Sequence, residues 1–248
     1  MTTVALLEIE AVSKAFGSLK AVDGISFEVG AGEIFGVAGP NGSGKSTLFN
    51  IITGIPFGPD AGRVRLDGAE IQGRSGNDIA RMGLARTFQR ETSFDGLTVL
   101  ENAVIGANFG KPGQSLSAVR DQAAEALEFV GIARPFFGRL AGELSVYDRK
   151  CLMLATAIAM KPRILLLDEP ASSLTRPEIE TSIDLIRRTA ARGITIVLIE
   201  HVLTFLMSLS QHLLVLNNGR VLASGAPATV IEDPKVVEAY LGKRGARR

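Results

Sequence analysis

The pattern of apolar and polar positions predicts short strands spread along the whole chain. Apolar residues alternate with polar ones over residues 6–12 and 25–29, a period of two that is typical of half-buried strands. Three further runs are apolar at nearly every position, as expected of strands covered on both faces. These runs are residues 34–38, 164–167 and 195–199.

Helical spacing replaces this pattern between about residues 91 and 160. One helical face there is formed by Val119, Ala123, Ala126 and Val130. Another helix is expected to begin at Pro177 and to end at Gly193. Its buried stripe is predicted to consist of Ile179, Ile183, Ile186 and Ala190. A shorter helix is predicted over residues 45–53, closed by Gly54.

Two turns complete the predicted arrangement. Asp67-Gly68 and Asn218-Gly219 are typical of hairpins, and residues 85–88 form one more candidate strand. The order of elements predicts an α/β fold: a mostly parallel sheet, antiparallel strands at its edge, and an inserted helical subdomain.

Composition and charge exclude several classes of protein. The chain is 46% apolar and 21% charged with a net charge of +1, so no strong field favours nucleic acid. Its basic cluster, at residues 243–248, is interpreted as a solvated tail. The single cysteine, Cys151, is expected to be a small core residue in a reducing compartment. The longest apolar stretch, residues 151–160, is too short to cross a bilayer, so any membrane association must come through partners.

The segment Gly39–Ser46 (GPNGSGKS) matches the phosphate-loop pattern G-x-x-x-x-G-K-[ST] at every fixed position. Glycines let consecutive backbone N–H groups turn toward phosphate oxygens, and the following helix N-terminus favours anions. Lys45 is expected to reach the β- and γ-phosphates of ATP, and the Ser46 hydroxyl to bind Mg²⁺. The residues expected to hold the nucleotide are Gly39, Asn41, Gly42, Ser43, Gly44, Lys45, Ser46 and Thr47.

Acidic and imidazole side chains follow two of the covered strands. Asp168 and Glu169 come directly after residues 164–167; the first is expected to hold Mg²⁺ and the second to polarise an attacking water. His201 follows residues 195–199 and is a candidate donor to the γ-phosphate. His212, in contrast, is interpreted as a structural histidine.

With these motifs in order, the chain resembles the ATP-binding-cassette family of P-loop NTPases over residues 7–242. The resemblance implies a core of residues 7–90 and 161–242 and a helical subdomain over about 91–160. It identifies Gln89, in Thr87-Phe88-Gln89, as a Q-loop residue that contacts Mg²⁺ and water and senses a permease. Phe16 corresponds to the aromatic residue that stacks on adenine, and His201 to the switch histidine.

Several stretches are similar to the ATPase subunits of branched-chain amino-acid importers, although lipopolysaccharide-export and urea-uptake ATPases share parts of them. These stretches are residues 19–26, 97–103, 193–201 and 238–242. The resemblance implies a second ATP-binding subunit, two permease subunits, an external binding protein and a place at the cytoplasmic face of the membrane.

The family's LSGGQ signature, which binds the partner subunit's ATP, is altered here to Leu144-Ser145-Val146-Tyr147-Asp148. Ser145 is kept, while Tyr147 is expected to add bulk and Asp148 to repel a γ-phosphate. The change predicts a heterodimer with one strong and one weak site, and a homodimer active at both sites is the alternative. A regulatory subunit without catalysis and a DNA-repair or ribosome-associated ATPase also remain open, although a single cassette without heptads disfavours the latter.

Overall fold

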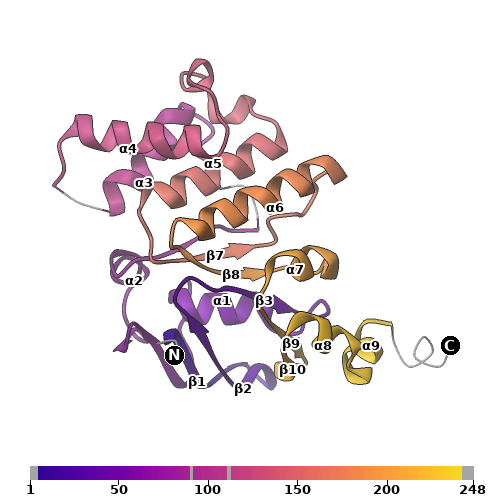
Figure 1. Ribbon diagram of the computed structural model, residues 1–248. Helices are drawn as coiled ribbons and strands as arrows, with labels where there is room; N and C mark the ends of the chain where they lie inside the picture. Colours follow the sequence, from indigo (N-terminus) through magenta and orange to yellow (C-terminus); the bar gives the residue numbers. More distant parts are fainter. Residues whose placement is uncertain (1–4, 90–91, 111–112, 242–248) are drawn as a thin grey trace.

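The computed structural model describes residues 5–89, 92–110 and 113–241, so the basic tail, Glu91 and Gly242 lie outside the described residues. Two sheets organise the chain (Figure 1). The larger has the order β10-β9-β3-β8-β7-β6 and the smaller the order β2-β1-β4-β5. In the larger sheet every neighbouring pair is parallel except β9 and β10, which confirms the predicted mostly parallel sheet.

The strands of the larger sheet are β3 (Ile34–Ala38), β6 (Leu84–Arg86), β7 (Ile164–Asp168), β8 (Thr195–Ile199), β9 (His212–Asn217) and β10 (Arg220–Gly225). The antiparallel sheet contains β1 (Ala5–Phe16), β2 (Leu19–Gly30), β4 (Ala61–Leu66) and β5 (Ala69–Glu70). β1 and β2 are longer than the alternation of apolar residues predicts, because the hairpin they form extends to the exposed Phe16–Leu19 end. β6 is shorter than predicted, since the chain leaves the sheet before Phe88, which is exposed.

The helices are α1 (Lys45–Thr53), α2 (Gly76–Arg81), α3 (Val99–Gly110), α4 (Leu116–Phe129), α5 (Val146–Ala159), α6 (Arg176–Ala191), α7 (Leu203–Leu209), α8 (Pro227–Glu232) and α9 (Pro234–Leu241). Gly54 caps α1 in the left-handed conformation, as predicted. The predicted face of α4 is buried. On α6 the most deeply buried residues are Leu185, Ile186 and Thr189, while Ile179, Ile183 and Ala190 of the predicted stripe are only partly buried.

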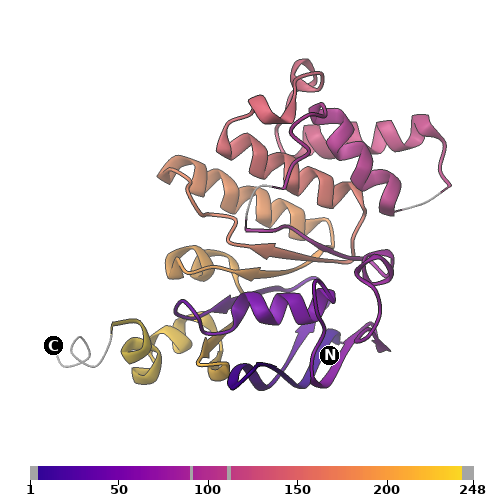
Figure 2. The same ribbon diagram turned by 180° about the vertical axis from the view of Figure 1, so that it is seen from behind.

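Strand alternation divides the apolar interior into two cores. On β7, Leu165 and Leu167 face the core shared with α3–α7, whereas Ile164 and Leu166 face the core that contains α1 and the smaller sheet. Helices α3, α4 and α5 pack together beyond α6, and α1 lies between the two sheets (Figures 1 and 2). Because the parallel strands end at one edge, the segments that follow β3, β7 and β8 come together there.

Candidate nucleotide site

The loop Gly39–Gly44 joins β3 to α1 in a conformation that requires glycine. Gly39, Gly42 and Gly44 have φ angles of 146°, 78° and 104°. A Cβ atom on Gly39 would lie 2.3 Å from the Leu216 carbonyl oxygen, and one on Gly44 2.3 Å from that of Ala21. The loop is therefore pressed against β9 and β2, with its backbone turned as a phosphate cradle requires.

Lys45 holds its ammonium group inside this loop. Its Nζ donates to the carbonyl oxygens of Gly39 at 2.7 Å and Pro40 at 3.1 Å. Burial lowers the pKa of Lys45, and the charges of Glu169 and Asp168 oppose that shift. Ser46 and Thr47, in the first turn of α1, are exposed and partly exposed. The loop, the ammonium group and the helix N-terminus thus lie within one short segment.

Asp168, at the end of β7, pairs with Arg86, a residue that the sequence analysis missed. Arg86 Nη2 lies 2.8 Å from Asp168 Oδ2, with the two side chains 7% and 4% exposed. Arg86 Nη1 also donates to Asn50 Oδ1 of α1 at 2.8 Å. Burial raises the pKa of Asp168, while the bond to Arg86 acts in the opposite direction. Asp168 Oδ1 is buried and has no hydrogen-bond partner among the described residues.

Glu169, Gln89 and His201 come together, although they are far apart in the sequence. Gln89 Nε2 donates to Glu169 Oε2 at 2.7 Å, and His201 Nδ1 lies 4.0 Å from the same oxygen. Glu169 adopts φ 49°, in the left-handed region that a side chain rarely occupies. The Glu169 carboxylate is therefore held at the strand edge between an amide and an imidazole.

A second buried carboxylate, that of Glu200, also escaped the sequence analysis. Its side chain is fully buried, and burial raises its pKa. Glu200 accepts the Ala171 N–H at 2.7 Å and the His201 N–H at 3.1 Å. These bonds join the segments that follow β7 and β8, and so fix the backbone on which His201 and Glu169 sit.

Phe16 is exposed, whereas His212 is partly buried. Phe16 is 46% exposed at the end of β1 and meets Phe57 edge-on, with ring centroids 5.2 Å apart. His212 stacks on Phe35, and its Nε2 lies 2.8 Å from Ser224 Oγ, which supports the structural role predicted for it.

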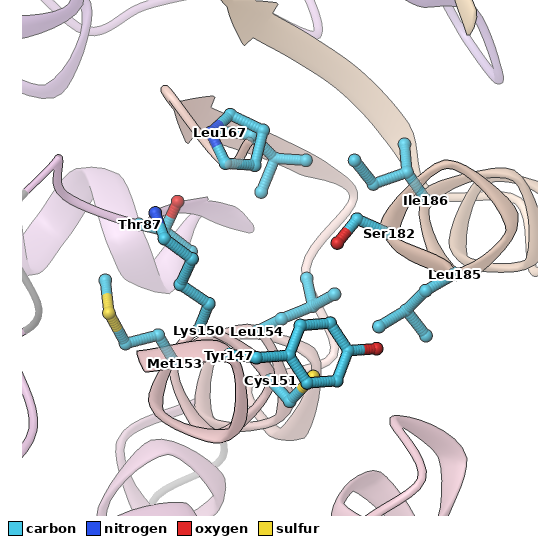
Figure 3. A pocket seen from close by; sticks show the side chains of 11 residues that line it. Thr87, Tyr147, Lys150, Cys151, Met153, Leu154, Leu167, Ser182, Leu185 and Ile186 are labelled. Carbon is cyan, nitrogen blue, oxygen red and sulfur yellow. The ribbon is translucent and has the colours of Figure 1, made fainter. Parts of the chain in front are cut away.

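Ser145 caps α5 and is engaged by its own helix. Its Oγ accepts the Asp148 N–H at 3.1 Å and donates to Asp148 Oδ2 at 2.8 Å. Tyr147 does not provide the expected bulk at the helix start, because its ring is turned inward, toward a cavity between α5 and α6 (Figure 3). Val146, which is 43% exposed, provides bulk there instead.

The cavity beside Tyr147 is also where the side chain of Cys151 lies. It is lined by residues of α5, β7 and α6, with a volume of about 40 Å³ (Figure 3). Cys151 is buried there, and burial raises the pKa of its thiol to about 11. The thiol is therefore a neutral core group, as predicted from its apolar neighbours.

A glycine-rich loop between a buried strand and a helix, with acids at the end of a neighbouring strand, defines the class of P-loop nucleoside triphosphatases. Comparison with known proteins identifies the family within this class. The family description "ABC transporter" matches residues 22–172, and "Branched-chain amino acid ATP-binding cassette transporter" matches residues 220–246. The chain belongs to the ABC transporter family as an ATP-binding subunit, the part that hydrolyses ATP to drive transport.

Relatives match along nearly their full length. The high-affinity branched-chain amino acid transport ATP-binding protein BraF of Pseudomonas aeruginosa is 37% identical, over 96% of this chain and 98% of its own. The probable branched-chain amino acid transport ATP-binding protein LivG of Methanocaldococcus jannaschii is 35% identical, over 97% and 99%. A solved ATP-binding cassette of an ABC transporter in its ADP conformation superposes with a TM-score of 0.87 at 34% identity, over 97% of this chain and 100% of its own. No helix within the described residues is long and apolar enough to span a bilayer.

Proposed function

We propose that this chain binds and hydrolyses ATP to energise the import of branched-chain or other hydrophobic amino acids. The contact between Gln89 and Glu169, beside the Gly39–Ser46 loop, supports hydrolysis in this chain. The substrate class rests on the relatives, which are branched-chain amino acid transport proteins, and on the segment 220–246. An importer for another substrate is the alternative.

The residues fit a magnesium ion held with the nucleotide. Asp168 leaves one buried carboxylate oxygen without a partner among the described residues, and hard oxygen ligands suit Mg²⁺. Ser46, Gln89 and Asp168 would hold the ion, which when bound neutralises charge on the β- and γ-phosphates. The unpartnered Asp168 Oδ1 at the end of β7 is the observation that favours a magnesium site.

The protein's own groups then have separate roles. Lys45 and the loop amides orient the phosphates, while Phe16 offers an exposed ring for the adenine. Glu169 orients the attacking water and accepts its proton, and Gln89 holds that carboxylate in place. His201, near Glu169, donates to the γ-phosphate. All of these groups come from this chain.

We infer that the complex contains two permease subunits, a second ATP-binding subunit and an external binding protein, with this chain at the cytoplasmic face of the membrane. A surface cavity beside Gln89 offers a docking place for a permease. The cavity is lined by Phe88, Phe94, Asn102 and Met160, among others.

The altered signature favours a heterodimer. A γ-phosphate needs hydroxyl and amide donors, but the Ser145 hydroxyl donates to Asp148 and exposed Val146 stands where glycine is usual. The chain therefore contributes poorly to its partner's site while keeping its own phosphate loop, Asp168 and Glu169. A homodimer active at both sites is the alternative, and brisk ATP turnover by the isolated chain would favour it.

The test is reconstitution of the transporter. The chain is captured from membranes with its partners, which are identified, and the complex is placed in proteoliposomes with labelled leucine as probe. ATP-dependent leucine uptake is expected, and it should be lost in complexes that carry Lys45→Ala. A complex that hydrolyses ATP without transporting leucine, valine or isoleucine would overturn the substrate assignment.

A further inference from the structure

The C-terminal helix α9 returns to the phosphate loop. The Tyr240 hydroxyl accepts the backbone N–H of Gly39 at 2.8 Å, across 201 positions of the sequence. The Tyr240 ring is partly buried against the larger core. Burial raises the pKa of the phenol, so the group remains a neutral hydroxyl. The contact joins the first residue of the loop to the last helix of the chain.

Gly39 is the first residue after β3, and both of its peptide groups are held by hydrogen bonds. The parallel pairing of β3 with β9 ends at Ala38, so the next N–H, that of Gly39, depends on Tyr240 for its partner. The Gly39 carbonyl oxygen accepts from Lys45 Nζ at 2.7 Å. Both polar groups of this glycine are therefore satisfied, one by α9 and the other by the nucleotide-binding lysine.

The hairpin formed by β9 and β10 supports the same loop. The Gly219 N–H, in the turn between β9 and β10, donates to the Ser43 carbonyl oxygen at 3.1 Å. The Leu216 carbonyl oxygen lies where a Gly39 side chain would otherwise be. The loop thus rests on the β9–β10 hairpin, and Tyr240 closes one side of that support.

We propose that Tyr240 is a positioning residue for ATP binding, through which helix α9 helps to shape the phosphate loop. The hydroxyl holds the peptide that carries the Gly39 N–H, and Lys45 holds the next peptide, which carries the Gly39 carbonyl oxygen. Pre-organising the loop reduces the entropy lost when phosphates bind. The proposal rests on phosphate binding by the Gly39–Ser46 loop.

The test compares Tyr240→Phe, which removes only the hydroxyl, with Tyr240→Leu, which also removes the ring. The matched control is Ser224→Ala, which removes a hydrogen bond of the same C-terminal segment, on exposed β10. Binding is measured with a fluorescent ATP analogue. Hydrogen exchange is followed in the peptide that covers residues 35–48, and thermal unfolding is recorded for every variant.

We expect Tyr240→Phe to weaken nucleotide binding about fivefold, the usual weight of one hydrogen bond, and to speed exchange in the loop peptide. The control should match the wild type in both. If Tyr240→Phe binds and exchanges like the wild type, the inference is overturned, and a defect found only in Tyr240→Leu would show that the ring acts through packing alone. Failure of the wild type itself to bind ATP would instead overturn the proposed function.

Discussion

Arg86 and Asp168 form an ion pair of 2.8 Å in which the side chains are 7% and 4% exposed. The pair joins the ends of two neighbouring parallel strands, β6 and β7, and Arg86 extends the link to Asn50 of the phosphate-loop helix. The pair ties the carboxylate proposed to hold Mg²⁺ to the residue directly before the Q-loop stretch Thr87–Gln89.

Arg86→Met is expected to lower the free energy of unfolding by about 3–5 kcal/mol, because it leaves the Asp168 charge buried and unpaired. Urea denaturation measures this change. Arg163→Gln is the control, since it breaks an exposed pair with Asp67 and should cost about 0.2–1 kcal/mol. Equal effects of the two changes would show that burial of the Arg86 pair does not matter for stability.

Glu169→Gln is expected to reduce ATP turnover by a factor of about 100 or more while ATP binding is retained, because an amide cannot accept the proton of the attacking water. Phosphate release and binding of an ATP analogue are measured side by side. Glu125→Gln, an exposed change on α4, should leave both unchanged. Turnover that persists in Glu169→Gln would show that Glu169 is not the general base.

Restoring residues of the LSGGQ signature tests whether the altered signature weakens one of the two ATP sites. The double change Val146→Gly with Asp148→Gln frees the Ser145 hydroxyl and the helix N-terminus, so ATP turnover by the isolated chain should rise by about tenfold or more. Turnover is measured against protein concentration, because the complete site requires two chains. The same double change combined with Glu169→Gln is the control and should stay inactive. An unchanged rate would favour a homodimer that already uses the altered signature.

The raised pKa of the Cys151 thiol predicts that the free energy of unfolding depends on pH. The folded thiol has its pKa raised to about 11 from an ordinary value of 9.0, so the folded state binds the proton more tightly than the unfolded chain. This contribution is complete below about pH 9 and is lost as pH rises toward about 11, by an amount on the order of 2–3 kcal/mol. Urea denaturation of the wild type and of Cys151→Ala at pH 7.5 and 10.5 should show the smaller loss in the variant. Equal losses of unfolding free energy in the wild type and in Cys151→Ala would show that other groups cause the pH dependence.

Much of the nucleotide site was predictable because its motifs are local. The cradle spans consecutive residues, and the covered strands announce their own ends, so the sequence predicts Gly39–Ser46 from its motif and places Asp168 and His201 at the ends of covered strands. The period of two also contained a signal for Arg86, which was missed. Leu84 on β6 and Ile164 and Leu166 on β7 all face the core around α1, which places Arg86 and Asp168 on that same face.

The amino-acid sequence by itself determined the phosphate loop, the succession of strands and helices, and the acids at the strand ends, since each depends on neighbours a few residues away. Only the tertiary structure decided that Gln89 meets Glu169, that Tyr147 turns inward beside α6, and that Tyr240 bonds to Gly39. Those contacts join residues brought together by strand order and helix packing. Their side chains meet because the backbone places them within hydrogen-bond or van der Waals distance, a condition that no local pattern of residues expresses.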